Sequence, residues 1–334
     1  MSWKVLITAR TLTEVGNQAI ALLREAKCEL TIPSRFGPYP ADELQPLLEG
    51  HDAVFASMDK FNASVLGSPE AAQLKIISRW GVGYDAIDIP AATAQGVLVA
   101  YTPGLLNETV ADFAFALLLS AARRVHVGYL NMSRGEWQGA WGNDVFGKTL
   151  GILGCGRIGQ AMARRASGFN MRLLGYDIRP DPKAEKLGIK FVSLDELLAE
   201  SDFLSLHAAL TPENRGLIGE AQLRRMKPSA YLINTARGAL LDEAALERAL
   251  REGWIAGAAL DAFVVEPLPP NHGLRTAPNL LITPHLASFA RETGERVSTT
   301  AAQAIVDFMR GQKPQFVVNP EVYASPRLRQ ALRK

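Results

Sequence analysis

The chain has 334 residues, 48% of them hydrophobic, which is enough to build the cores of two ordinary domains and excludes a disordered chain. Its 36 basic and 34 acidic residues leave a net charge of +2, so neither nucleic acid nor a membrane is an expected partner. Only two cysteines occur and no export signal is visible, which favours a reducing, cytoplasmic location.

From residue 4 to about 101, short apolar runs alternate with helix-like segments. The strand-like runs are 4–9, 29–32, 53–56, 75–79 and 97–101. This alternation predicts a parallel sheet. The run 75–79 leads into Arg79-Trp-Gly-Val-Gly-Tyr-Asp85, which places two glycines at the carboxyl edge, where α/β sheets bind ligands. A helix is expected from Glu108 to about Arg123, followed by an irregular stretch from Gly128 to Gly147.

A second series of strands begins at residue 149 and contains the clearest functional signal. An apolar strand runs into Gly154-Cys-Gly-Arg-Ile-Gly159, a helix-like segment follows, and another strand ends in an acid. Gly154 permits the tight turn, Gly156 lets the backbone approach a pyrophosphate, and Gly159 lets the helix pack closely on the strand. The pyrophosphate would lie on the first turn of this helix, at Arg157 and Ile158. The pattern predicts a dinucleotide site.

Asp177, the acid that ends the second of these strands, indicates which dinucleotide to expect. Its carboxylate can accept hydrogen bonds from both ribose hydroxyls and would repel a 2′-phosphate, which favours NAD over NADP. Arg179 could offset part of this repulsion, so NADP stays open. Further strands at 203–207, 230–235, 256–260 and 280–283 make six in this series. His207 ends one of them and is expected to line the cofactor pocket.

Three side chains after the glycine motif could carry the chemistry of a dehydrogenase. Arg237 is a permanently charged, planar donor that can grip a carboxylate and polarise a 2-oxo group. His285 carries an imidazole, the type of side chain best suited to giving and taking a proton near neutrality. Glu266 could hold the imidazole and favour its protonated form. Each also has a structural interpretation, as a loop ion pair, a core histidine or a helix cap. No metal site is expected.

A long amphipathic helix from about Arg291 to Arg310 and a proline-containing tail complete the chain. We expect this part to return to the first domain. The predicted domains are a discontinuous substrate-binding domain, 1–101 with 289–334, and an NAD-binding Rossmann domain, 102–288. The expected fold is α/β, with two doubly wound parallel sheets, the first of them flavodoxin-like, and a cleft between the domains.

At these residues the chain resembles the D-isomer-specific 2-hydroxyacid dehydrogenase family over nearly its whole length. Six motifs follow the family's order: Gly81–Gly83, Thr102–Asp112, the glycine motif, Asn234–Gly238, Asp261–Pro267 and Pro284-His285. The resemblance implies a catalytic triplet of Arg237, Glu266 and His285.

The resemblance also implies the binding residues and the assembly. Backbone N–H groups of Gly81, Val82 and Gly83 would hold the substrate carboxylate, with Arg237 and His285 at the same substrate. The residues implied at the nicotinamide end of NAD are Thr235, Ala236, Arg237, Asp261, His285, Ala287 and Ser288. The family further implies a homodimer held largely by the cofactor domain, with the 108–123 helix contributing.

The implied reaction interconverts a D-2-hydroxy acid and its 2-oxo acid. Within the family the chain looks most like the phosphoglycerate dehydrogenase branch, in which Arg79, with Lys60, could bind a phosphate. That match weakens at Ala56, where such enzymes usually carry an arginine, and in the loop after Trp137, which lacks a basic residue. We therefore expect a small or sugar-derived acid such as glycerate or hydroxypyruvate first, and phosphoglycerate second. A non-catalytic NAD-sensing protein of the corepressor type is a further alternative.

Overall fold

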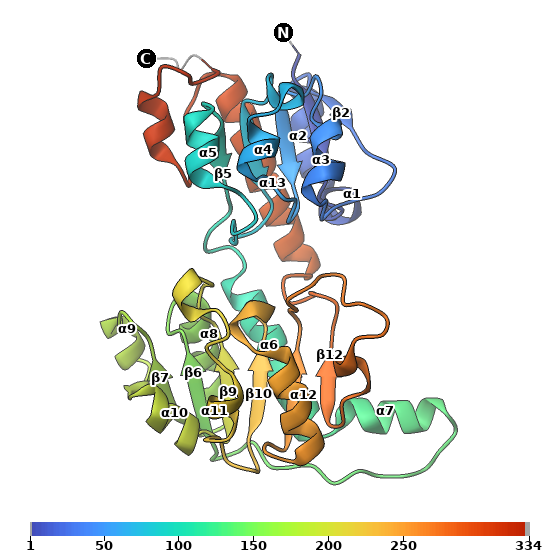
Figure 1. Ribbon diagram of the computed structural model, residues 1–334, viewed down its shortest axis with the longest axis vertical. Helices are drawn as coiled ribbons and strands as arrows, with labels where there is room; N and C mark the ends of the chain where they lie inside the picture. The colour runs from blue at the N-terminus through green and yellow to red at the C-terminus, as the bar shows by residue number, and fades with distance from the viewer. Residues whose placement is uncertain (1, 331–334) are drawn as a thin grey trace. The chain divides into compact units, whose positions relative to one another are not determined.

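The computed structural model describes residues 2–330, which form two α/β units (Figure 1). The first unit is the chain up to Leu106 and from Phe289 on, and the second is Asn107–Ser288. Residues 102–106, expected in the cofactor domain, belong to the first unit, where Thr102 N–H donates to the Gly81 carbonyl. Residues 1 and 331–334, part of the predicted substrate-binding domain, lie outside the described residues.

The first unit contains a five-stranded parallel sheet in the order β2-β1-β3-β4-β5. Its strands are β1 (Lys4–Ile7), β2 (Glu29–Thr31), β3 (Ala53–Ala56), β4 (Ile76–Arg79) and β5 (Leu98–Ala100). The order 2-1-3-4-5 is the flavodoxin-like arrangement. β3 and β4 are buried along their whole length, as expected of parallel strands covered by helices on both faces.

The helices of the first unit come from both ends of the chain. They are α1 (Thr11–Val15), α2 (Asn17–Glu25), α3 (Ala41–Leu47), α4 (Ala63–Leu66), α5 (Ile89–Ala94) and α13 (Arg291–Met309). α13 packs against α2 and β4, and Trp80 Nε1 donates to Ser298 Oγ at 3.0 Å. Beyond α13, the fully buried Asn319 accepts the Val99 N–H at 2.8 Å through its side chain. The C-terminal segment is therefore an integral part of this unit.

The second unit contains a seven-stranded parallel sheet in the order β12-β11-β10-β9-β6-β7-β8. Its strands are β6 (Thr149–Leu153), β7 (Arg172–Tyr176), β8 (Lys190–Phe191), β9 (Phe203–Leu206), β10 (Tyr231–Asn234), β11 (Gly257–Leu260) and β12 (Leu280–Ile282). Numbered from β6, the order is 3-2-1-4-5-6-7, the Rossmann arrangement with one added strand. The sequence predicted six strands and missed β8, because two residues at a sheet edge carry no periodic signal.

Helices cover both faces of the second sheet. They are α6 (Asn107–Ala122), α7 (Val125–Ser133), α8 (Arg157–Ser167), α9 (Pro182–Glu185), α10 (Leu194–Glu200), α11 (Glu220–Leu223) and α12 (Glu243–Glu252). Neighbouring residues of β10 point to opposite faces: Leu232 joins the apolar cluster of α12, and Ile233 joins that of α6 and α8. None of the helices in residues 2–330 combines the length and apolarity needed to span a membrane.

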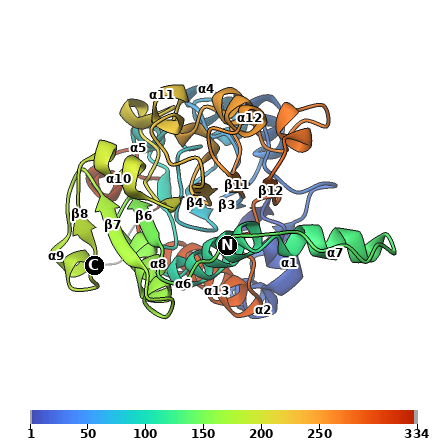
Figure 2. The same ribbon diagram turned by 90° about the horizontal axis from the view of Figure 1, so that it is seen from below.

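The segment between α6 and β6 differs from the expectation of an irregular stretch beginning at Gly128. α7 continues as a helix to Ser133, yet it has no buried residue and extends from the rest of its unit (Figures 1 and 2). This helix could not be predicted from periodicity, because a helix without a buried face shows no amphipathic period. We call residues 125–146 the arm. Its large exposed apolar side chains are Val125, Tyr129, Leu130, Met132, Trp137, Trp141 and Phe146.

Candidate active site

The predicted glycine turn lies where β6 meets α8, at the carboxyl edge of the second sheet. Gly154 has a φ of +94°, and a Cβ there would lie 2.4 Å from the Ala208 nitrogen. A Cβ on Gly159 would lie 2.2 Å from the Gly154 carbonyl oxygen. A Cβ on Gly156, in contrast, would meet no described atom within 4 Å. The first turn of α8, with Arg157 and Ile158, has no side-chain cap among the described residues and begins beside this open space, which fits a pyrophosphate.

Asp177 follows β7 and turns its carboxylate toward the glycine turn. Its Oδ2 accepts the Cys155 N–H at 2.8 Å, and its Oδ1 accepts the Arg179 N–H at 2.9 Å. Each oxygen keeps a second lone pair for a ribose hydroxyl. Burial, together with the nearby Asp177 charge, raises the pKa of the Cys155 thiol to about 12, so this cysteine is not a nucleophile.

His207 follows β9 and forms the back wall of the glycine turn. Its N–H donates to the Leu153 carbonyl at 2.7 Å, and its Nε2 lies 2.8 Å from Ser205 Oγ. Burial lowers the pKa of His207 to about 4, so the ring is neutral at pH 7. His207 can therefore pack against a dinucleotide but brings no positive charge to it.

Arg237, Glu266 and His285 lie on loops that follow β10, β11 and β12 at the same edge of the sheet. His285 Nδ1 is 2.8 Å from Glu266 Oε2, and Glu266 Oε1 accepts the Phe263 N–H at 2.9 Å. Burial works to raise the pKa of Glu266, but the hydrogen bond and charge of His285, with smaller effects of Phe263 and Arg237, lower it overall. Glu266 is therefore an anion at neutral pH that holds one nitrogen of the imidazole.

The loop that carries Arg237 is ordered by Asn234, which is fully buried. Asn234 Nδ2 donates to the Arg237 carbonyl at 2.9 Å, and its Oδ1 accepts the Ala236 N–H at 3.0 Å. Sequence reasoning missed this function of Asn234, although a side-chain amide at a strand end is a known way to fix a turn. A Cβ on Gly238 would lie 2.0 Å from the Phe263 carbonyl carbon, so the Arg237 and Glu266 loops lie directly against each other. Thr235 belongs to the same loop.

Asp261, expected beside the nicotinamide, is 1% exposed and binds the loop that carries His285. Its Oδ1 accepts Thr283 Oγ1 at 2.6 Å and the Leu286 N–H at 2.8 Å, while its Oδ2 accepts the Ala287 N–H at 2.8 Å. His285 has a φ of +54°, a conformation that residues other than glycine rarely adopt. Asp261 therefore holds the His285 loop in an unusual shape, and Ser288 ends the same loop.

Replacing Asp261 with asparagine is expected to displace this loop. In either orientation the NH2 group of the amide would face a backbone N–H, that of Leu286 or that of Ala287, and an unpaired buried N–H costs about 1–3 kcal/mol of unfolding free energy. A displaced His285 should lower kcat about 10- to 100-fold. Thermal unfolding measures the effect on stability, and steady-state kinetics measures the effect on kcat. Thr283→Val is the comparison variant, because it removes only one of the donors to Asp261. An Asp261→Asn protein with wild-type kcat would contradict this role.

The expected substrate residues of the first unit lie at the end of β4 and directly after it, and two of them depart from the prediction. Arg79 is 9% exposed, and its guanidinium packs beneath Gly81, 3.0 Å from a Cβ built there, and 2.7 Å from Met58 Sδ. Arg79 was expected to face a phosphate, but its guanidinium is therefore not presented to one. The Gly81 N–H donates to Thr102 Oγ1 at 2.9 Å and is already used. Val82 is exposed, and the role of Val82 and Gly83 stays a prediction.

Comparison with known proteins identifies the family of the chain. The family model of the D-isomer specific 2-hydroxyacid dehydrogenase, NAD binding domain, matches residues 115–287. A glyoxylate reductase of Thermofilum pendens is 42% identical over 329 residues, which cover 96% of this chain and 95% of the relative. The chain belongs to the D-isomer-specific 2-hydroxyacid dehydrogenase family. This family membership makes the protein an NAD(P)-dependent oxidoreductase with NAD as its cofactor.

Two further proteins are similar to this chain over most of its length. A glyoxylate reductase of Korarchaeum cryptofilum is 51% identical over 259 residues, which cover 75% of this chain and 78% of the relative. The crystal structure of the TT0316 protein from Thermus thermophilus has a TM-score of 0.84 at 41% identity, covering 94% of this chain and 99% of that one. The predictions of family, α/β fold, enzyme class and cofactor are thereby confirmed.

Proposed function

We propose that this dehydrogenase uses NADH to reduce a small, unphosphorylated 2-oxo acid of the glyoxylate and hydroxypyruvate class to the D-2-hydroxy acid. The observation that carries the proposal is the 2.8 Å contact between His285 and Glu266 beside the Arg237 loop. A proton donor, the anion that orients it and a fixed cation are the groups that carbonyl reduction requires besides the hydride. Several relatives described as glyoxylate reductases support the size of the substrate.

Each residue has a separate part in this proposal. NADH supplies the hydride when bound, with its pyrophosphate at Gly156. His285 gives a proton to the carbonyl oxygen from Nε2, because its Nδ1 is held by Glu266. Arg237 binds the substrate carboxylate and stabilises negative charge at the oxygen. We further propose that the backbone of Val82 and Gly83 binds that carboxylate.

The position of Arg79 supports an unphosphorylated substrate over D-3-phosphoglycerate. A phosphate needs exposed cations, whereas this guanidinium lies under Gly81 and beside the buried Asp59, whose carboxylate is within electrostatic range. Asp59 accepts the Ser57 and Tyr39 N–H groups at 3.0 Å each and is 0% exposed. Arg79 is therefore proposed to support the loop above it.

One assay tests the substrate proposal and its rivals. The loss of NADH absorbance would be followed with glyoxylate, hydroxypyruvate, phosphohydroxypyruvate, pyruvate and longer 2-oxo acids, and repeated with NADPH. The highest kcat/KM is expected for glyoxylate or hydroxypyruvate. A preference for phosphohydroxypyruvate would instead identify a phosphoglycerate dehydrogenase. Tight NADH binding without any turnover would favour the NAD-sensing, corepressor-like alternative.

The preference for NADH is expected to depend on Asp177. Asp177→Ala removes the carboxylate that repels a 2′-phosphate and leaves Arg179 beside the ribose, so kcat/KM for NADPH relative to NADH should rise at least about tenfold. The ratio is measured with one 2-oxo acid at fixed concentration. Asp181→Ala is the matched control, because Asp181 caps α9 a few residues later. An unchanged ratio in Asp177→Ala would refute the argument for NAD.

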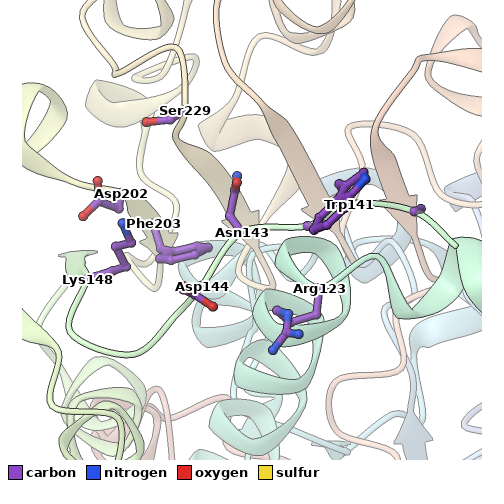
Figure 3. A pocket seen from close by; sticks show the side chains of 10 residues that line it. Arg123, Trp141, Asn143, Asp144, Lys148, Asp202, Phe203 and Ser229 are labelled. Carbon is purple, nitrogen blue, oxygen red and sulfur yellow. The ribbon is translucent and has the colours of Figure 1, made fainter.

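We also propose a homodimer formed through the cofactor unit, with the arm as its main contact. The arm leaves Trp137 91% and Trp141 100% exposed, which is unusual for a monomer. Trp141 borders a cavity of about 520 Å³ at the amino edge of β6, β9 and β10, opposite the edge that carries His285 (Figure 3). Its charged lining residues are Arg123, Asp144, Lys148 and Asp202. A patch with both charge signs and exposed tryptophans can pair with its own copy around a two-fold axis.

The large exposed apolar side chains thus lie on the arm, while α6 packs on its own sheet and pairs Glu108 with Arg164 and Arg165. Sedimentation equilibrium at micromolar concentration should give twice the chain mass, and the mass of one chain would exclude the dimer.

Both cysteines are free thiols, which supports the cytoplasmic location expected from the sequence.

A further inference from the structure

The turn that carries Glu266 is held by a second carboxylate, from Glu243 at the start of α12. Glu243 Oε1 accepts the Val264 N–H at 2.7 Å, and the Glu243 side chain is only 10% exposed. The preceding N–H, that of Phe263, donates to Glu266 Oε1 at 2.9 Å. Two consecutive backbone N–H groups are therefore bound by two carboxylates, one inside the turn and one outside it.

The same glutamate also reaches the far end of this loop. Glu243 Oε2 lies 3.4 Å from His272 Nε2, and His272 Nδ1 accepts the Leu274 N–H at 3.3 Å. The acceptor role of Nδ1 places the proton of a neutral ring on Nε2, which faces Glu243. Gly273 packs against Glu247 one helical turn later, since a Cβ there would lie 2.0 Å from its Oε2. The loop from Phe263 to Gly273 is thus attached to α12 near both ends.

The turn at Val264 lies on the backbone of the Arg237 loop, and the Glu243 side chain holds it at a fixed distance from α12. A Cβ on Gly238 would lie 2.3 Å from the Val264 nitrogen, so the turn rests directly on the Arg237 loop. α12 begins a few residues after Gly238 and carries the Glu243 carboxylate to the Val264 N–H from the side. Movement of Val264 away from Glu243 would carry Glu266, two residues later, away from His285.

We propose that Glu243 is a positioning residue, which acts by holding the Glu266 turn so that Glu266 meets His285. This inference rests on the proposed function of Glu266 and His285. Glu243 does not touch the reacting atoms, so its loss should change kcat while leaving NADH affinity unchanged. The requirement is for a hydrogen-bond acceptor at this point, and a charge is not essential.

The test compares three variants of the full-length protein. Glu243→Met keeps the length of the side chain but removes the acceptor, and Glu247→Met makes the same change one helical turn later. Glu243→Gln keeps an uncharged acceptor for the Val264 N–H and turns its NH2 group toward His272, whose Nε2–H then donates to water, since that side chain is 31% exposed. We expect kcat for glyoxylate reduction to fall about tenfold or more in Glu243→Met. Glu243→Gln and Glu247→Met should stay within about twofold of wild type. The Kd for NADH, measured by its fluorescence, should be unchanged in all three.

Amide hydrogen exchange in the NADH-free protein gives a readout that does not depend on turnover. Exchange of both the Val264 and Phe263 amides should accelerate in Glu243→Met and stay slow in Glu243→Gln. Acceleration at Val264 alone, with wild-type kcat, would overturn the proposal. If wild type turned over no 2-oxo acid, the proposed function would fail, while the Phe263 amide would still decide whether Glu243 holds Glu266. If Glu243→Met does not fold, Glu243→Asp takes its place in the comparison, because its carboxylate is one methylene too short to reach the Val264 N–H.

Discussion

Replacing His285 with glutamine is expected to lower kcat for 2-oxo acid reduction about 10³-fold, because positioned general acid catalysis contributes about 10²–10⁴-fold. Glutamine keeps the approximate size and can donate to Glu266, but it cannot give a proton to the carbonyl oxygen. The Kd for NADH should change little, since the pyrophosphate and ribose sites at Gly156 and Asp177 are separate from this loop.

Stopped-flow absorbance with saturating NADH measures the kcat effect on His285→Gln, and fluorescence titration measures NADH binding. His126→Gln is the matched control, because His126 lies in the arm, away from the glycine turn and the His285 loop, and its Nδ1 contacts the Ser120 carbonyl. Loss of NADH binding with turnover retained would show that His285 serves the cofactor and does not supply the proton.

Arg237→Lys should be nearly as damaging although it keeps the positive charge. A lysine presents one compact ammonium where arginine presents a planar fork, so binding of the carboxylate by two parallel hydrogen bonds is lost. We expect kcat/KM to fall about 10²–10³-fold, with KM for the 2-oxo acid raised and kcat lowered. Arg248→Lys, a surface change opposite Glu220, should leave both constants unaltered. A change confined to KM would mean that Arg237 binds the substrate without stabilising the charge on its oxygen.

Residues whose function follows from their place at a strand end could be predicted from the sequence. The glycine turn, Asp177, Arg237 and His285 all follow apolar runs, and parallel strands bring their carboxyl ends to one edge. The contact between His285 and Glu266 is predicted by the chemistry of the two side chains and by the family resemblance, and the structure shows that it joins the loops after two neighbouring strands.

Side-chain direction and loop bonding could not be predicted in this way. Arg79 ends β4 as expected, but whether its guanidinium points outward or beneath Gly81 depends on packing that a single sequence does not encode locally. The Gly81 N–H is bound by Thr102, which lies far along the chain. Asn234 and Glu243 were missed because their partners are backbone groups, and any residue supplies those. Such bonds become visible only when the loops are seen together.

The burial of both cysteines makes the native sequence suitable for site-specific labelling. Burial, with the Asp52 charge, raises the pKa of Cys28 to about 11, and Cys155 is still less acidic, so neither thiol forms an appreciable thiolate at pH 7. A maleimide dye should therefore react with a cysteine introduced at an exposed position and spare the native ones. With one such position in each unit, Lys60→Cys and Lys186→Cys, fluorescence transfer between two dyes could follow the distance between the units as NADH is added.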